Sequence, residues 1–380
     1  GFHTCVEELR RDGGVVIPMQ VNAASAGRLA ATRREPVGVV VAVSAFNHPV
    51  NLIVHQVAPA IATGCPVIVK PAPDTPLSCL AVMAVLHESG LPPEWGRTIV
   101  TDRLDVAERL VTDPRVGFFS FIGSARVGWS LRARLAPGAR AALEHGGAAP
   151  VIVAADADLA DAVPRLLKGG YYHAGQVCVS VQRVFAHADV ARDLAERLAT
   201  GAKALRVGDP TDAATEVGPL IRPREVARVE DWVGEAVDGG GAPMAGGTRL
   251  SETCYAPTVL YEPPPASRVS TQEVFGPVVC VYPYTDLDEA MARANALPYA
   301  FQAAVFTADI DTAMRCFAGL DGSAVMVNDH TAFRVDWMPF AGLRQSGLGV
   351  GGIPHTMRDM QVDKMLVLRS DAMTMASASQ

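Results

Sequence analysis

Val37-Gly-Val-Val-Val-Ala-Val-Ser44 is an almost fully apolar, β-branched run, and Ala45-Phe-Asn-His-Pro49 follows it directly. A short run of this kind is typical of a strand that is buried on both faces of a parallel sheet. From Pro49 to Ala62 the sequence predicts a helix, which Gly64 ends. A buried strand followed at once by a helix is the first half of a βαβ unit and indicates an α/β protein.

The same alternation continues on both sides of a glycine pair, Gly146-Gly147. Before the pair, the predicted strands and helices are Pro66–Lys70, Leu77–Glu88, Thr98–Val100, Asp105–Val111, Val116–Phe121 and Arg126–Leu135. After it, they are Val151–Val153, Asp158–Tyr172, Val181–Ala186 and Val190–Leu205. Strands that alternate with helices form parallel sheets with right-handed connections. The fold class is therefore α/β, and ligands are expected beyond the carboxyl ends of the strands.

Composition limits the class of protein. The chain has 380 residues, of which 49% are hydrophobic and 19% charged, so it is long enough for two domains and is not disordered. A net charge of −7 without a basic stripe argues against a nucleic-acid partner. There is no apolar run long enough for a membrane span, and the first residues lack the basic and apolar regions expected of a signal peptide. The seven scattered cysteines suit a reducing compartment, so we expect a cytoplasmic protein.

Three separate side chains could form one reactive site. Cys178 ends the string Gly175-Gln-Val-Cys178, Glu144 precedes the glycine pair, and Asn47 follows the first strand. A thiolate is a nucleophile, a carboxylate can act as a general base, and an amide N–H can stabilise an oxyanion. Each residue also has a plain structural interpretation: an inert buried cysteine, a solvated loop carboxylate and a helix N-cap. Taken singly, the residues leave both interpretations open.

Other residues could contact a phosphate or a ribose. Lys70 ends a predicted strand, and Gly123-Ser-Ala-Arg-Val-Gly128 follows a strand and opens a helix, as a phosphate site would. This string is not the Gly-x-Gly-x-x-Gly fingerprint, and it lacks the Gly-Lys-Ser/Thr ending of a P-loop. Lys70 could equally be an ordinary surface lysine, and Gly347-Leu-Gly-Val-Gly-Gly352 is predicted to be a loop. The spacing of histidines and cysteines predicts no metal site.

In this order and spacing, the strings resemble the aldehyde dehydrogenase family from about Glu35 to about Leu368. The motifs that carry the resemblance are Glu35-Pro-Val-Gly-Val-Val with Phe46-Asn47, Lys70-Pro71 with Thr75-Pro76, Gly123-Ser124, Glu144 with Gly146-Gly147, Gly175-Gln-Val-Cys178 with Arg183, Glu273-Val-Phe-Gly-Pro277 and Pro339-Phe-Ala-Gly-Leu-Arg-Gln-Ser-Gly347. The resemblance implies that an aldehyde is oxidised through a cysteine thioester. Cys178 would be the nucleophile, Glu144 the general base, and Asn47 with the Cys178 N–H the oxyanion hole.

The resemblance also implies where a dinucleotide binds. The implied cofactor-binding residues are Ser44, Ala45, Phe46, Lys70, Pro73, Gly123, Ser124, Gly128, Glu273 and Phe275. NAD is the expected cofactor. Family members commonly carry an acidic residue where Pro73 stands, and that residue binds the adenosine ribose. The choice between NAD and NADP therefore stays open.

The resemblance further implies a domain arrangement and an assembly. A dinucleotide-binding domain is expected at 1–146, a catalytic domain at 147–345, and a return segment with an oligomerisation strand at 346–380. Family members carry a further N-terminal segment before the point where this chain begins, so part of the first domain is expected to be missing. A homodimer or homotetramer is expected to form through strands within 17–35, including Ile17–Val21, and at Lys364–Leu368. A truncated, non-catalytic subunit is the alternative, which the presence of the whole reactive trio disfavours.

The segment Val327–Pro339 lies where the family lines the entrance for its substrate. It places Arg334 among apolar residues, which is unfavourable for a cation unless an anion meets it; an ion pair with Asp336 is the structural alternative. This segment and His48 are most similar to the phosphonoacetaldehyde dehydrogenase branch, so His48 and Arg334 are expected to bind the anion of a small aldehyde. Val177 stands where that branch carries an arginine, and lactaldehyde dehydrogenases are near relatives. The identity of the aldehyde is therefore left open.

Overall fold

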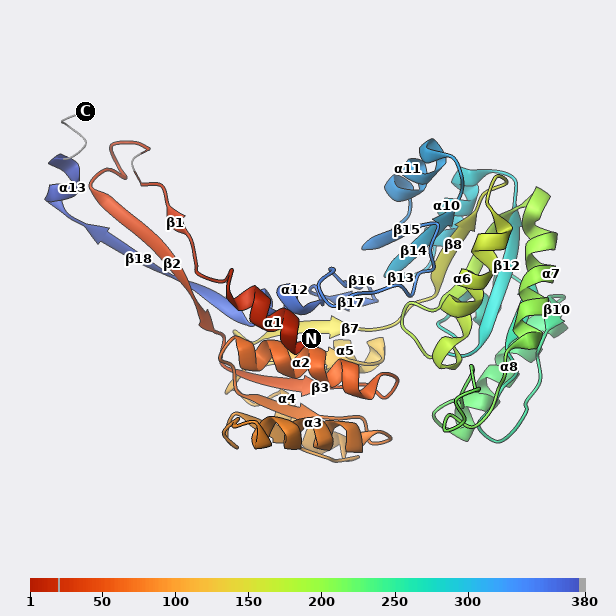
Figure 1. Ribbon diagram of the computed structural model, residues 1–380, viewed down its shortest axis with the longest axis horizontal. Coiled ribbons are helices and arrows are strands. Elements are labelled where there is room, and N and C mark those ends of the chain that lie inside the picture. The colour runs from red at the N-terminus through yellow and green to blue at the C-terminus, as the bar shows by residue number, and fades with distance from the viewer. Residues whose placement is uncertain (20, 376–380) are drawn as a thin grey trace.

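The structure, a computed structural model, describes residues 1–19 and 21–375. Figure 1 shows an elongated molecule in which two α/β units stand side by side and a long ribbon of strands extends from one of them. Each unit is built on a mainly parallel sheet, which confirms the predicted α/β class. Within the described residues, no helix is long and apolar enough to cross a membrane.

The first sheet has six strands in the order β17-β7-β6-β3-β4-β5. Five of them are parallel: β3 (Val39–Val43), β4 (Val67–Lys70), β5 (Gly96–Thr98), β6 (Val116–Ile122) and β7 (Arg140–Glu144). The connecting helices are α2 (Pro49–Ala62), α3 (Pro76–Glu88), α4 (Leu104–Val111) and α5 (Ala125–Arg132). The chain runs outward from β3 through β4 to β5 and then returns to β6 on the other side of β3. The carboxyl ends of β3 and β6 therefore form the switch point of a doubly wound sheet, where ligands bind.

Most elements of this sheet lie where the sequence predicts them. Val40, Val41 and Ala42 of β3 are fully buried, as expected of a central strand. Two predictions were wrong in detail. The strand predicted at Thr98–Val100 is β5, two residues earlier, because Gly96 and Arg97 pair with β4 despite their low strand propensity. Part of the loop predicted at Gly347–Gly352 is a short strand, β17 (Gly347–Leu348), antiparallel to β7. A Cβ on Gly347 would lie 2.4 Å from the Leu143 carbonyl oxygen, so only glycine allows this approach.

The second sheet has seven strands in the order β10-β11-β12-β9-β8-β14-β15. They are β8 (Ala149–Val153), β9 (Val181–His187), β10 (Ala242–Ala245), β11 (Thr258–Tyr261), β12 (Val278–Tyr284), β14 (Gln302–Phe306) and β15 (Ala324–Val327). All pairs are parallel except β10 with β11. The helices of this unit are α6 (Leu159–Tyr171), α7 (Ala188–Ala204), α8 (Pro223–Asp238), α9 (Arg268–Thr271), α10 (Leu287–Asn295) and α11 (Ile310–Gly319). The predicted elements between Val151 and Leu205 are confirmed as β8, α6, β9 and α7.

The remaining elements are short and lie outside the two main sheets and the ribbon. They are α1 (Phe2–Leu9), α12 (Ile353–Asp359), α13 (Asp371–Met375), the 3₁₀ turn η1 (Tyr172–Gly175) and the two-stranded pair of β13 (Tyr299–Ala300) and β16 (Leu343–Arg344). One buried apolar cluster holds α1, α2 and α12 together. The chain passes from the first sheet to the second between β7 and β8, and it returns through the segment after β15.

The ribbon contains β1 (Val16–Ile17), β2 (Arg28–Pro36) and β18 (Gln361–Arg369), all antiparallel. The strand predicted at Lys364–Leu368 is confirmed as part of β18. The strand predicted at Ile17–Val21 is only the short β1, and residue 20 lies outside the described residues. β18 is an edge strand of this sheet, and its apolar side chains Met365, Leu366, Val367 and Leu368 are exposed.

Candidate active site

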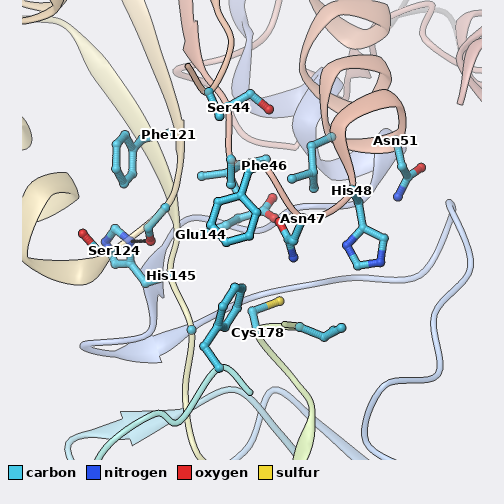
Figure 2. Close-up of a pocket in the computed structure, with 18 of the residues that line it drawn as sticks. Ser44, Phe46, Asn47, His48, Asn51, Phe121, Ser124, Glu144, His145 and Cys178 are labelled. Carbon is cyan, nitrogen blue, oxygen red and sulfur yellow. Dashed lines mark hydrogen bonds between the residues drawn. The ribbon is translucent and has the colours of Figure 1, made fainter. Parts of the chain in front are cut away.

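A cavity of about 550 Å³ lies between the two sheets, at the carboxyl ends of β3, β4, β6 and β7. Figure 2 shows that Cys178 enters it from the second unit and faces side chains that the first unit supplies. The cavity brings together most residues that the sequence suggested for catalysis, cofactor and substrate. They are Ser44, Ala45, Phe46, Asn47, His48, Lys70, Pro73, Gly123, Ser124, Glu144, Cys178, Glu273, Phe275 and Arg334.

Gly128 is the exception. It is buried in α5 behind the cavity wall and does not line the cavity. A Cβ at this position would lie 2.1 Å from the His145 ring and 2.8 Å from the Phe121 ring. The glycine therefore lets α5 pack on these two rings, and its predicted contact with the cofactor has no support in the geometry.

The loop before Cys178 is held in a tight and unusual conformation. His173, Ala174 and Gly175 all have positive φ angles. A Cβ on Gly175 would lie 2.2 Å from the Gly276 carbonyl oxygen, so this position requires glycine. The Gln176 side chain fixes the next turn, since it donates to the Pro219 carbonyl (3.2 Å) and accepts from the Ile221 N–H (2.9 Å). The thiol is thereby presented to the cavity on a rigid loop.

Asn47 is joined directly to this loop. Its Nδ2 donates a hydrogen bond of 2.9 Å to the Gln176 carbonyl oxygen. The N-cap of α2 is His48, whose side chain makes no capping bond, so the N-cap interpretation of Asn47 was wrong. An amide Nδ2 carries two hydrogens, and one remains for a second acceptor. Because Asn47 lines the cavity, that hydrogen can serve a developing oxyanion.

Burial dominates the protonation of the reactive groups. It raises the pKa of Cys178 to about 12, and the charges of Glu144 and Glu273 act in the same direction while Arg334 opposes them. Burial also raises the pKa of Glu144, again against Arg334. For Glu273, burial raises the pKa to about 8 although the carboxylate accepts a hydrogen bond of 3.1 Å from the Gly147 N–H. The free site therefore holds a protonated thiol at neutral pH, near two carboxyl groups whose pKa values burial also raises.

The alkylation of Cys178 in the cofactor-free protein should consequently rise steeply with pH. Only the thiolate reacts, and below the pKa of about 12 its fraction grows about tenfold for each pH unit. Iodoacetamide labelling of Cys178, followed by mass spectrometry between about pH 7 and pH 10, measures this rate. A plateau near about pH 8.5, the value of an unperturbed thiol, would contradict the raised pKa.

The residues at the switch point fit a dinucleotide. The Ser44 Oγ is buried and has no hydrogen-bond partner among the described residues. Lys70 donates to the Pro71 carbonyl (3.2 Å), and burial lowers the pKa of its ammonium while Asp102 opposes the shift. Ser124 is an exposed N-cap whose side chain makes no capping bond. Hydroxyl groups, a cation and a helix N-terminus are what ribose and phosphate groups need.

Apolar and acidic groups complete this part of the cavity. The Phe46 and Phe275 rings lie 5.9 Å apart, edge to face. Pro73 brings no carboxylate to the wall, and the neighbouring Asp74 forms two hydrogen bonds of 2.7 Å with Arg222, the N-cap residue of α8. No free carboxylate therefore stands at the position of Pro73 to bind a ribose or to reject a 2′-phosphate.

Arg334 lies near Cys178 in an unusual setting. Its Nη2 donates to His55 Nδ1 over 3.1 Å, and its guanidinium carbon lies 4.0 Å from the centre of the Phe340 ring. Its Nε is buried without a hydrogen-bond partner among the described residues. The alternative of a direct ion pair with Asp336 was wrong, because Asp336 contacts His55 instead, at 2.9 Å from Nε2. The positive charge of Arg334 is thus not neutralised by a carboxylate in contact.

His48 shares this end of the cavity. Its ring lies 4.2 Å from the His173 ring and 6.1 Å from the Tyr172 ring. Burial lowers the pKa of His48 to about 4, and His173 and Arg334 add to the effect. His48 is therefore neutral near pH 7, and it offers a hydrogen bond rather than a charge.

Some residues of the site were missed by the sequence analysis. They are Asn51, Tyr172 and Phe340 in the wall and His55 behind Arg334, whereas Asp336 was considered only as a direct ion-pair partner of Arg334. For one of them a signal existed: His55 follows His48 by seven positions, so two turns of α2 place both on one face. Tyr172 and Phe340 come from distant segments, and the sequence holds no local signal for their meeting.

The first sheet is doubly wound, and the edge at which such sheets bind ligands faces the loop that carries Cys178 in the second unit. This arrangement is that of an α/β enzyme that binds a nucleotide. Comparisons with known proteins are more specific. The model of the aldehyde dehydrogenase family matches residues 1–366. The 3-sulfolactaldehyde dehydrogenase of Priestia megaterium is 37% identical over 362 residues, which are 95% of this chain and 76% of the relative.

Solved structures agree. Aldehyde dehydrogenase 21 from Physcomitrella patens, in complex with the reaction product succinate, superposes with a TM-score of 0.93 at 37% identity, over 97% of this chain and 76% of that one. The glyceraldehyde-3-phosphate dehydrogenase of Methanocaldococcus jannaschii, complexed with NADP, gives 0.91 at 34% identity, over 97% and 79%. The chain belongs to the aldehyde dehydrogenase family, and it is an NAD(P)-dependent enzyme.

Proposed function

We propose that the chain oxidises a small aldehyde with a singly charged anionic tail to the carboxylic acid, through a thioester on Cys178. Arg334 carries this proposal. No carboxylate among the described residues contacts its guanidinium, which instead bonds His55 and lies over the Phe340 ring, and a cation in such a setting favours an anionic ligand. Arg334 lines the same cavity as Cys178, so the ligand that it awaits is one that also reaches the thiol.

The proposed chemistry uses the side chains as placed. The Cys178 thiol loses its proton to solvent, and the thiolate Sγ adds to the aldehyde carbon. The free Nδ2 hydrogen of Asn47 stabilises the resulting oxyanion, whose collapse expels a hydride. A bound NAD(P), held by the residues at the switch point, would supply the hydride acceptor. Glu144, whose pKa is raised by burial, then takes a proton from the water that hydrolyses the thioester.

Charge supports a tail with one negative charge. Arg334 brings one fixed positive charge, His48 is neutral near pH 7, and Val177 adds no cation. The similar proteins take different anions by name: a sulfonate in sulfolactaldehyde, a carboxylate in succinate and a phosphate in glyceraldehyde 3-phosphate. A sulfonate or carboxylate matches one guanidinium, whereas a dianionic phosphonate would also need a proton on His48. We therefore propose monoanionic aldehydes as the preferred substrates, and phosphonoacetaldehyde stays a second prediction.

Arg334→Ala should lower kcat/KM for a monoanionic aldehyde roughly 30- to 1000-fold, which corresponds to a loss of about 2–4 kcal/mol of transition-state stabilisation. Loss of a charge-assisted contact affects the charged substrate alone, so a neutral aldehyde of similar size should change little. NAD(P)H formation is measured with succinate semialdehyde, phosphonoacetaldehyde, lactaldehyde and propionaldehyde. Arg334→Lys should recover little, because an ammonium cannot reproduce the planar guanidinium.

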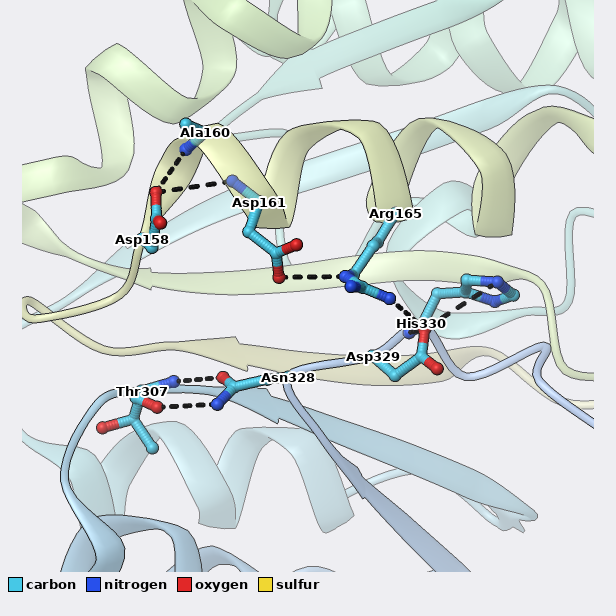
Figure 3. Close-up of polar contacts among 8 residues, drawn as sticks. All are labelled: Asp158, Ala160, Asp161, Arg165, Thr307, Asn328, Asp329 and His330. Carbon is cyan, nitrogen blue, oxygen red and sulfur yellow. Dashed lines mark hydrogen bonds and ion pairs between the residues drawn. The ribbon is translucent and has the colours of Figure 1, made fainter.

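A matched control tests whether the effect belongs to the cavity. Arg165 of α6 pairs with Asp161 and Asp329 in Figure 3 and does not line the cavity. Arg165→Ala should therefore leave the ratio of charged to neutral turnover unchanged. Equal losses of Arg334→Ala on charged and neutral aldehydes would assign a structural role to Arg334 and remove the anion from the proposal.

A homo-oligomer belongs to the same proposal. β18 leaves a backbone edge without a strand among the described residues, and exposed apolar side chains line it. Edges of this kind pair with another chain. Sedimentation at micromolar concentration should therefore give a dimer or tetramer, and a monomer at that concentration would contradict the proposal.

The two sheets also support a division into a dinucleotide-binding domain at 1–146, a catalytic domain at 147–345 and a return segment at 346–380. The free cysteines suit the reducing cytoplasm, which we propose as the compartment.

A further inference from the structure

We propose that His55 and Asp336 position Arg334 for the anionic tail of the substrate, with the imidazole acting as a spacer between guanidinium and carboxylate. This inference rests on the proposed function and extends it to residues outside the cavity wall. Neither His55 nor Asp336 lines the cavity, so both act through Arg334 rather than on the substrate.

The chemistry of the three groups fixes the direction of each hydrogen bond. A guanidinium can only donate, so His55 Nδ1 must be the acceptor of the 3.1 Å bond from Arg334 Nη2. The proton of the imidazole therefore sits on Nε2, which donates to Asp336 Oδ1 over 2.9 Å. The carboxylate thus selects the tautomer that can hold Arg334.

The surroundings of His55 favour this neutral tautomer. Its side chain is only 6% exposed, in the interior of α2. Burial lowers its pKa to about 4, and the charge of Arg334 adds to the effect although Asp336 opposes it. A protonated ring would present an N–H to the guanidinium and lose the bond. The neutral His55 ring therefore links Asp336 to Arg334 and orients the guanidinium, without adding a charge near neutral pH.

A spacer explains why Asp336 does not bind Arg334 directly. A carboxylate in contact would occupy the forked face of the guanidinium and neutralise the charge that an anion needs. Through the imidazole, Asp336 fixes one nitrogen of Arg334, while the Phe340 ring 4.0 Å away fixes the plane of the group. The Nη1 of Arg334 makes no hydrogen bond among the described residues and is not buried, so it stays available to a ligand. The result is an oriented cation with a free donor.

The test compares a charged and a neutral substrate in Asp336→Asn and His55→Leu. The full chain is assayed with NAD(P), using succinate semialdehyde and propionaldehyde. In either variant KM for succinate semialdehyde should rise about tenfold, the loss expected for one hydrogen bond to a charged group. The ratio of kcat/KM for the two substrates should fall by the same factor. His55→Gln keeps an acceptor and a donor, and it should restore part of the ratio.

Asp329→Asn is the matched control. Asp329 and Asp336 have similar exposed fractions, 30% and 34%, and Asp329 also faces an arginine, Arg165, at 3.4 Å (Figure 3). Because Asp329 does not line the cavity, its replacement should leave the ratio unchanged. If Asp329→Asn lowers the ratio as much as Asp336→Asn does, the loss of any carboxylate on this segment is sufficient to lower it. That result would overturn the inference.

A double-mutant cycle separates this inference from the proposed function. If Asp336 acts through Arg334, then Asp336→Asn should not lower the ratio further in an Arg334→Ala background. An additional, independent loss in that background overturns the positioning role. If the single variant Arg334→Ala affects both substrates equally, the proposed preference for an anionic aldehyde is wrong. If Arg334→Ala is selective but Asp336→Asn and His55→Leu are not, only the positioning role falls.

Discussion

Replacement of Cys178 by serine should abolish NAD(P)H formation and the hydrolysis of activated esters together. A serine hydroxyl in this buried site cannot ionise as a thiol does, so no covalent intermediate forms. We expect kcat to fall by on the order of 10⁴-fold or more, as is usual when a nucleophile is removed. The measurement is NAD(P)H absorbance with succinate semialdehyde, together with nitrophenyl acetate cleavage without cofactor.

Cys254→Ser provides the control for this change. Cys254 is free and half-buried like Cys178, but it does not line the cavity. It should therefore retain both activities. Full dehydrogenase activity in Cys178→Ser would rule out the thioester route, and ester cleavage that survives without dehydrogenase activity would mean that another group attacks esters.

Glu144→Gln should give a burst of NAD(P)H in the first turnover and then almost no steady rate. The amide cannot accept a proton from water, so the thioester forms but is not hydrolysed. Removal of a general base typically costs about 10²–10⁴-fold, and here the cost should fall on deacylation alone. Stopped-flow absorbance resolves the burst, and intact-mass spectrometry should detect the acyl group on Cys178.

Glu273→Gln separates the two carboxyl groups. Glu273 also lines the cavity and has a pKa of about 8, but the Gly147 N–H holds it by a hydrogen bond. If Glu273 contacts the cofactor, its replacement should weaken NAD(P) binding without trapping an acyl-enzyme. A Glu144→Gln variant without a burst would show that Glu144 also takes part before hydride transfer. An acyl-enzyme trapped only by Glu273→Gln would exchange the two roles.

Local patterns in the sequence were sufficient for most of the fold. β3 and α2 follow from an apolar β-branched run and a proline at the first helical position. The position of the cavity followed as well, because the carboxyl ends of parallel strands meet at one edge. β17 could not be predicted in the same way, since its pairing depends on the approach of two distant backbone segments at a glycine.

Side-chain contacts over long sequence separations were beyond such patterns. Cys178, Glu144 and Asn47 were proposed as one site because each stands in a distinctive string, and the same cavity brings them together. Arg334 was noticed for its apolar neighbours, but its bond to His55 joins residues 279 positions apart. No periodicity links them, and the competing expectation of an ion pair with Asp336 was equally consistent with the sequence. Gly128 was assigned to the cofactor because the string around it resembles a phosphate loop, whereas packing of α5 on His145 decides its position.

The hydrogen bond from Asn47 to the Gln176 carbonyl has a consequence for how this site is dissected. It spans 129 positions of sequence and ties the first sheet to the loop that presents Cys178. The amide therefore aligns the two α/β units with each other, in addition to its proposed contact with the oxyanion. Any substitution of Asn47 removes both functions at once. The rate loss that such a substitution produces will exceed the loss expected from removing one oxyanion donor. The difference measures how much the reaction rate depends on the alignment of the two units.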